Sequence, residues 1–297
     1  MRRPGALLAA VPFVLGLAAL GPRPAVPDRS ALPDRPALPD RPGASRTVRV
    51  DPDTLLPWRF PVGERMEYSV TWGGIRLGTG SLTVEAVDTA FARQVYRVAM
   101  TIEGGPPFYR VEDRMASWIL PEPFTSLRFE QRQREGDYRR DRRIELDPEA
   151  LTYTRRDLKE GEWRLHPDEV DVPIPDGALD EISYLYFARL LPLEPGVRYE
   201  FERYFKEQGN PVVVEVLRRE EIRVPAGKFR TLVLRPEIRT SGIFREGGEA
   251  ELYITDDERR IPVRVRTSMA IGSGNFFLTG YEPGEGGALI APPADGR

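Results

Sequence analysis

The chain has 297 residues, of which 43 are Lys or Arg and 46 are Asp or Glu, so its formal net charge is only −3. A nearly neutral chain has no global basic field, which argues against a protein dedicated to nucleic-acid binding. The chain has no cysteine and one histidine, His166, so its composition excludes disulfides, thiolate catalysis and histidine-cluster metal sites. We therefore expect no metal and no cofactor.

The N-terminal segment has the pattern of an export signal. Arg2 and Arg3 precede an uncharged apolar run over residues 6–20, which Pro12 interrupts. The run is shorter than the about 20 apolar residues of a spanning helix and is typical of a signal peptide over residues 1–21. Pro22 would hinder cleavage after Gly21, so an uncleaved anchor is the alternative. We expect an exported protein of the periplasm or cell envelope, whose membrane contact is confined to residues 1–21 if they stay uncleaved.

Proline-rich sequence follows the signal. Residues 27–42 contain a six-residue repeat that begins with Pro-Asp-Arg. Proline stiffens the chain, disfavours the interior of a helix and cannot donate a backbone hydrogen bond in a β-sheet. This stretch also has too little apolar surface to fold. Residues 22–57 are therefore predicted to be a disordered spacer, and residues 284–297 a disordered tail.

Residues 58–283 are predicted to form a single β domain, because apolar and polar residues alternate with a period of two. In the segment 64–72, for example, Met66, Tyr68 and Val70 share one face. The apolar parity switches near Gly78 and Gly80, which predicts a β-bulge and a bend in that strand.

One segment breaks the alternation. Residues 180–191 carry apolar side chains at helical spacing, with Asp176 or Asp180 as a capping residue and Pro192 at the end. So many closely spaced strands, roughly a dozen, would be mostly antiparallel and would curl or split as a single sheet. The expected fold is mainly β: a strongly curved antiparallel sheet, a half-barrel or open barrel, whose concave side or edge is plugged by the one helix.

Several segments of this domain resemble a known family. The similarity lies in residues 60–68, 72–78, 180–189, 224–229, 250–257 and 260–263. In this order they are similar to the exported bacterial domain-of-unknown-function family numbered 3108, over about residues 60–282. The resemblance implies an envelope protein and supplies no activity and no catalytic residue.

Polar residues at inward-facing positions are the candidate site. Buried charges are costly unless they are paired, so these residues form internal ion pairs, lie at sheet ends that reach solvent, or line a groove in the concave face. Only Lys159, Lys206 and Lys228 are lysines, so nearly all of the 43 basic residues are arginines. A lining of arginine and aromatic side chains would suit an anionic amphiphile or a glycan. The predicted groove residues are Asp113, Gln131, Gln133, Arg140, Arg142, Arg203 and Arg218.

Three functions are open at this point. The first is a non-enzymatic envelope protein that binds an amphiphile (a lipid), a glycan or a protein segment in its concave groove. The second is a structural or assembly protein that acts through sheet edges or the proline-rich arm. The third is a carboxylate-dependent glycan hydrolase or lyase, with Asp113 as one carboxylate. We favour binding, because the sequence shows no nucleophile–histidine triad.

Overall fold

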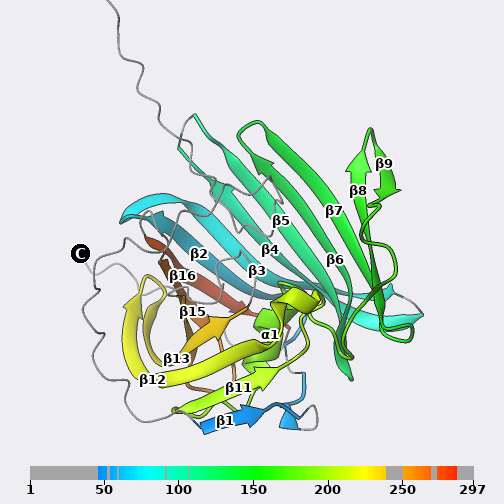
Figure 1. Ribbon diagram of the computed structural model, residues 1–297. Helices are drawn as coiled ribbons and strands as arrows, with labels where there is room; N and C mark the ends of the chain where they lie inside the picture. Colours follow the sequence, from blue (N-terminus) through cyan, green and yellow to red (C-terminus); the bar gives the residue numbers. More distant parts are fainter. Residues whose placement is uncertain are drawn as a thin grey trace, which may run out of the picture.

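The computed structural model describes residues 46–285, except residues 52, 53, 59, 91, 107, 239–249 and 269–272. The predicted signal peptide 1–21, most of the predicted spacer 22–57 and most of the tail 284–297 lie outside the described residues. The described part forms one sheet of 16 strands and one α-helix, so the prediction of a mainly β fold is confirmed (Figure 1).

The strands are, in chain order, β1 (Arg46–Arg49), β2 (Glu64–Trp72), β3 (Ile75–Ala90), β4 (Arg93–Gly104), β5 (Val111–Pro121), β6 (Phe124–Glu135), β7 (Tyr138–Asp147), β8 (Thr152–Lys159), β9 (Glu162–Leu165), β10 (Val172–Pro173), β11 (Val197–Phe201), β12 (Val212–Val224), β13 (Gly227–Glu237), β14 (Glu251–Thr255), β15 (Pro262–Ser268) and β16 (Ser273–Pro283). Helix α1 (Ser183–Leu190) lies between β10 and β11, and a 3₁₀ turn, η3 (Glu207–Gly209), precedes β12.

The sheet is open. Its order runs β1-β11-β12-β13-β14-β15-β16-β2-β3-β4-β5-β6-β7-β8-β10, and β9 pairs with β8 beside this path. The ladder between β1 and β11 is parallel, and every other ladder between described strands is antiparallel. The sheet curls around α1, which lies on its concave side between the two halves (Figure 1).

The predicted spacer ends earlier than expected. Residues 46–49 form an edge strand, and Val50 donates its backbone N–H to the carbonyl of Glu200 at 3.0 Å. The boundary at residue 57 is therefore wrong. The period-two pattern misses this strand because it has four residues, only one of them apolar.

The predicted bulge is present next to the glycines. Along the β2–β3 ladder, Val70 pairs with Gly78 and Thr71 pairs with Arg76, which leaves Leu77 as the extra residue. At Gly78 the two strands β3 and β4 approach closely, because an added Cβ would lie 2.1 Å from the carbonyl oxygen of Glu103. The bulge bends the strand and switches its apolar face, as the sequence indicates.

Helix α1 begins at Ser183, three residues later than predicted, because Asp180 and the two residues after it form the approach turn. Of the two predicted capping residues, Asp176 and Asp180, it is Asp180 that bonds to the start of the helix, although Ile182 occupies the N-cap position. The carboxylate of Asp180 accepts hydrogen bonds from the backbone N–H groups of Ile182 and Ser183 at 2.8 and 2.9 Å. Within the helix every residue except Leu185 is buried, so α1 is the centre of the core.

A buried ion pair fastens α1 to the sheet. The guanidinium of Arg189 donates to both carboxylate oxygens of Glu64 on β2, at 2.8 and 2.7 Å. It also donates to the carbonyls of Arg259 and Arg260, each at 2.9 Å, and lies over the ring of Phe60. The guanidinium of Arg189 is thus bonded entirely inside the fold, so this residue is structural.

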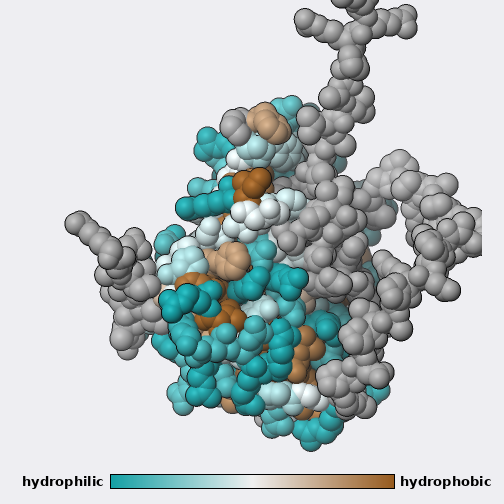
Figure 2. Space-filling view, turned by 90° about the vertical axis from the view of Figure 1, so that its left-hand side faces the viewer, coloured by the Kyte–Doolittle hydropathy of each residue, from teal (hydrophilic) through white to brown (hydrophobic). Residues whose placement is uncertain are grey.

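The face of the molecule in Figure 2 is mostly hydrophilic where it is coloured. On the face in Figure 2, hydrophobic side chains appear as small separate patches among hydrophilic ones. Helix α1, like every helix in the described ranges, is too short or too polar to cross a membrane.

Candidate functional site

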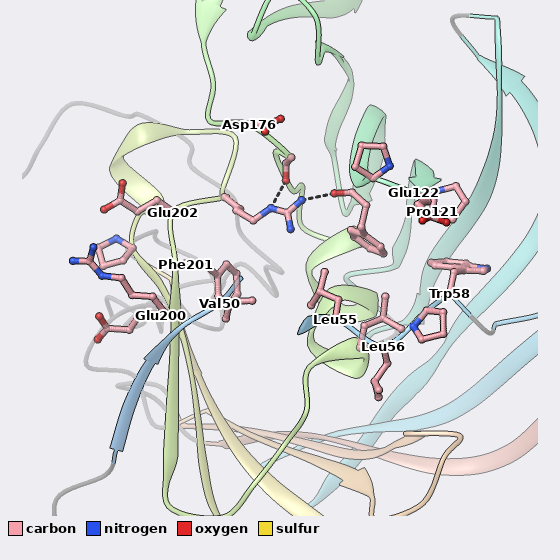
Figure 3. Close-up of a pocket in the computed structure, with 18 of the residues that line it drawn as sticks. Val50, Leu55, Leu56, Trp58, Pro121, Glu122, Asp176, Glu200, Phe201 and Glu202 are labelled. Atoms are coloured by element: carbon pink, nitrogen blue, oxygen red, sulfur yellow. Dashed lines mark hydrogen bonds between the residues drawn. The ribbon is translucent and has the colours of Figure 1, made fainter. Parts of the chain in front are cut away.

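A large groove opens at the end of the sheet where β1 and β11 lie. It has a volume of about 1240 Å³. We call it the basal groove, and its described lining comes from five segments (Figure 3). These are the end of β1, residues 55–58, the turn 121–124, residues 176–177 and residues 200–203, with single residues from β4, from α1 and from the loop before β12.

The apolar wall is held firmly against α1. Leu56 donates its backbone N–H to the carbonyl of Leu190 at 2.9 Å. The ring of Trp58 stacks on Tyr186 with centroids 5.5 Å apart, lies 4.7 Å from Tyr96, and donates its Nε1–H to the carbonyl of Phe60. Leu55, Leu56 and Trp58 are half-buried, so part of their apolar surface faces the groove.

The rim carries negative charge. Glu122, Asp176 and Glu202 are exposed around the opening, while Glu200 pairs with Arg198 at 2.9 Å (Figure 3). A polar rim around an apolar wall is the arrangement that suits a ligand with both apolar and polar parts.

Arg203 is the one predicted groove residue that lines the basal groove. Its guanidinium donates to the carbonyls of Phe124 and Gly177 (dashed lines in Figure 3) and lies over the ring of Phe187. Burial lowers its pKa to about 10, an effect that Asp176 partly offsets. Gly177, at φ +62°, leaves the space that this guanidinium occupies. Arg203 therefore fixes two walls of the groove to each other.

Four other predicted residues face the core as expected, away from the basal groove. Asp113, Gln131, Gln133 and Arg142 are buried on β5, β6 and β7. Arg142 pairs with Glu181 at 3.3 Å, so for this residue the ion-pair alternative holds. None of the four is among the described residues that line the basal groove.

A carboxyl pair lies among these residues. Asp113 accepts the backbone N–H of Arg134 at 2.9 Å, and Glu135 accepts hydrogen bonds from Gln133 and Tyr109, each at 3.4 Å. Burial and a hydrogen bond with Asp113 raise the pKa of Glu135 to about 7, and burial also raises the pKa of Asp113. Glu135 therefore keeps its proton to a higher pH than an ordinary carboxyl does. Neither carboxyl is among the described residues that line the basal groove, so the pair does not serve that groove as acid and base.

The last two predicted residues lie elsewhere. Arg140 is half-buried on β7, where burial and the neighbouring Arg142 and Arg155 lower its pKa. Arg218 points outward and is exposed, with Glu220 and Glu251 as its partners. The inward position predicted for Arg218 is wrong. A register shift between Val216 and Arg218 changes the face of the sheet toward which the side chains after it point.

The sequence pattern misses the main components of the groove. It assigns residues 55–57 to the spacer and indicates only a turn near residues 121–123. The one signal that could have indicated them is the large apolar residues beside proline, Leu56-Pro57-Trp58 and Pro123-Phe124, which are unusual in solvated segments. In the described part of the chain, no three His, Asp or Glu side chains form a group that could hold a metal ion.

Proteins of known structure that are similar to this chain include the following three. A β-barrel-like protein of the domain of unknown function DUF1849 from Brucella abortus has 9% identity, covers 74% of this chain and 97% of its own, and gives a TM-score of 0.43. A protein from Bacteroides fragilis described as exported, with a YmcC-like fold, has 11% identity, coverages of 77% and 99%, and a TM-score of 0.28. A protein from Parabacteroides distasonis described as a lipoprotein has 12% identity, the same coverages and the same TM-score.

Comparison with curated proteins gives no match. The family model described as "Protein of unknown function (DUF3108)" matches residues 67–279, which is most of the chain and nearly all of the sheet from β2 to β16. The chain therefore belongs to the DUF3108 family.

Proposed function

We propose that this chain is an exported envelope protein that binds an amphiphile, with the acyl chain in the basal groove. The observation that carries the proposal is the groove itself. Its volume of about 1240 Å³ exceeds the about 300–1,000 Å³ that is common for small-molecule sites, so it has room for an elongated ligand.

The wall of the groove favours an acyl chain over the other ligands considered. Leu55, Leu56 and Trp58 are half-buried and turn part of their apolar surface to the groove, and the rings of Phe124 and Phe201 are nearly buried in its wall. Covering such surface stabilises a complex by about 25 cal/mol per Å² of apolar area removed from water. A glycan would place hydroxyl groups against Leu55 and Leu56, which offer no hydrogen bonds in place of those lost to water.

Binding is favoured over catalysis by the chemistry of the lining. The described residues that line the groove include no serine, cysteine, histidine or lysine. The carboxylates of the lining that could act as general acid or base, Glu122, Asp176 and Glu202, are exposed to solvent at the opening. The carboxylate of Glu200 is paired with Arg198. The exposed carboxylates of Glu122, Asp176 and Glu202 surround the opening, where they can contact a polar head group.

The test uses the fluorescence of Trp58 with 12-bromododecan-1-ol as the probe, because bromine quenches an indole that it touches and the neutral head group is not repelled by the acidic rim. We expect saturable quenching in the wild type. The part of the quenching that arises from Trp58 should be absent in Trp58→Phe. Leu56→Asp places a charge on the apolar wall and should weaken binding at least tenfold, which is about 1.4 kcal/mol.

The matched control is Leu165→Asp, because Leu165 on β9 is 54% exposed and lies outside the groove lining. It should bind the probe as the wild type does. Circular dichroism establishes that both variants are folded. Equal affinities of the two aspartate variants, or an unquenched Trp58, would contradict the proposal.

A further inference from the structure

A second hollow lies on the outer face of the sheet, over β5 and β6 and beside the β8–β9 hairpin. Its volume is about 570 Å³, within the range of small-molecule sites. Its lining includes Arg97, Arg114, Arg132 and Arg134, and the indole rings of Trp118 and Trp163. We call it the arginine hollow. It shares no described lining residue with the basal groove, so binding at one site is independent of the function proposed for the other.

The arginine hollow has an excess of positive charge. Its lining contains two carboxylates, Glu130 and Asp141, besides the arginines. Glu130 pairs with Arg143 at 2.8 Å and Asp141 pairs with Arg134 at 2.5 Å, so both already have a cationic partner.

The remaining charges are unevenly balanced. Glu85 is shared by Arg97 and Arg114, at 3.1 and 2.7 Å, and Arg97 also pairs with Asp88 at 3.0 Å. Arg132 is therefore the arginine of the hollow that is left without an ion pair among the described residues.

Arg132 is exposed and lies directly opposite Arg114 across the β5–β6 ladder and opposite Asp141 across the β6–β7 ladder. Asp141 pairs with Arg134, and none of the ion pairs between described residues includes Arg132. Like charges directly opposite each other destabilise a ladder, and an anion placed between them would relieve the repulsion.

The two tryptophans are held in place by the same network. Trp118 donates its Nε1–H to Asp88 at 3.0 Å, and the guanidinium of Arg143 lies 4.4 Å from the ring centre of Trp163. Fixed indole rings offer flat apolar surfaces, against which the C–H face of a sugar ring can pack, while planar guanidinium groups bind carboxylates and phosphates in pairs of hydrogen bonds.

We propose that the arginine hollow binds an acidic saccharide: a short run of sugar units that carry carboxylate or phosphate groups. The sugar rings pack against Trp118 and Trp163, and Arg132 with Arg114 receives the anionic group. A hollow of this volume can enclose a short oligosaccharide. A flat anionic surface, such as that of a membrane, could not enter the hollow and would leave it empty.

The test is isothermal titration calorimetry with trigalacturonate as the carboxylated probe, maltotriose phosphate as the phosphorylated probe and maltotriose as the neutral one. We expect at least one acidic probe to bind and maltotriose to bind at least tenfold more weakly. The variant is Arg132→Glu, which should weaken binding of that acidic probe at least tenfold and leave the fold unchanged, because Arg132 is exposed and takes no part in the ion pairs of the hollow.

The matched control is Arg223→Glu on β12, which makes the same charge change at an exposed site on the other half of the sheet. It should bind within twofold of the wild type. Trp163→Ala distinguishes a saccharide site from a site that binds only the anionic group. Removing the indole should weaken binding of the acidic probe only if the sugar ring packs against it. The proposal is overturned if neither acidic probe binds, if the two glutamate variants behave alike, or if Trp163→Ala binds as the wild type does.

Discussion

Glu64 and Arg189 form the most completely buried ion pair among the described residues, with side chains 2% and 0% exposed. A buried pair of this kind gains its stability from satisfied hydrogen bonds, because desolvation offsets much of the Coulomb attraction. Arg189 meets that condition with two carboxylate oxygens and two carbonyls, and Tyr281 donates to the same carboxylate at 3.3 Å.

Removing one partner should therefore be costly. We expect Arg189→Met or Glu64→Gln to lower the free energy of unfolding by about 3–5 kcal/mol. The double variant should lose about 1–3 kcal/mol less than the sum of the single losses, because the remaining partner is no longer left alone. Urea unfolding of the four proteins measures this. Additive losses would show that the two side chains act independently.

The carboxyl pair makes a prediction about pH. The pKa of Glu135 is about 7 in the fold, against about 4.3 in an unfolded chain. A carboxyl whose pKa rises on folding stabilises the protein fully below its unfolded pKa, and this contribution is lost as the pH rises through about 7. The free energy of unfolding should therefore fall between pH 5 and pH 8.

Glu135→Gln isolates this effect. The variant keeps a neutral side chain of the same shape, so its stability should change less over that range than the stability of the wild type. Denaturant unfolding at a series of pH values is the measurement. Parallel curves for the two proteins would mean that Glu135 titrates normally in the fold.

At the scale of the elements, the sequence predicts most of what the structure contains. Alternation locates the long strands, and helical spacing locates α1 to within three residues at its start, because both patterns arise from burial on one face. It also places Asp113 and Gln131 on the core face. It fails at Arg218, where a bulge reverses the strand face, and at β1, which is held by a parallel ladder with β11 and has almost no apolar pattern.

Helix α1 gives the prediction at this scale. Phe187 packs against Phe124 on β6 and Phe201 on β11, with ring centroids 5.7 and 4.7 Å apart, so it joins two distant parts of the sheet. We expect Phe187→Ala to lower the free energy of unfolding by about 3–5 kcal/mol. Tyr138→Ala, at a site 45% exposed, should change it by less than about 0.5 kcal/mol. If Phe187→Ala lowers the free energy of unfolding by less than about 1 kcal/mol, the packing of α1 contributes little to the stability of the core.

At the scale of the whole molecule, the curl of the sheet creates the basal groove. It brings the end of β11 beside the start of β6, where Arg203 bonds to the carbonyl of Phe124. The walls come from segments that are far apart in the sequence and have no periodic pattern. Periodicity therefore predicts the curved sheet, whereas the groove depends on tertiary contacts such as Leu56 to Leu190.

The central claim is that the basal groove holds the acyl chain of an amphiphile. The most direct test is native mass spectrometry of the full chain purified from its own cell envelope, beside Leu56→Asp and Leu165→Asp prepared in the same way. We predict that the wild type and Leu165→Asp carry a bound molecule that releases a fatty acid on hydrolysis, and that Leu56→Asp carries none. A wild type with the mass of the polypeptide alone, or Leu56→Asp with the same bound molecule as the wild type, would contradict the claim.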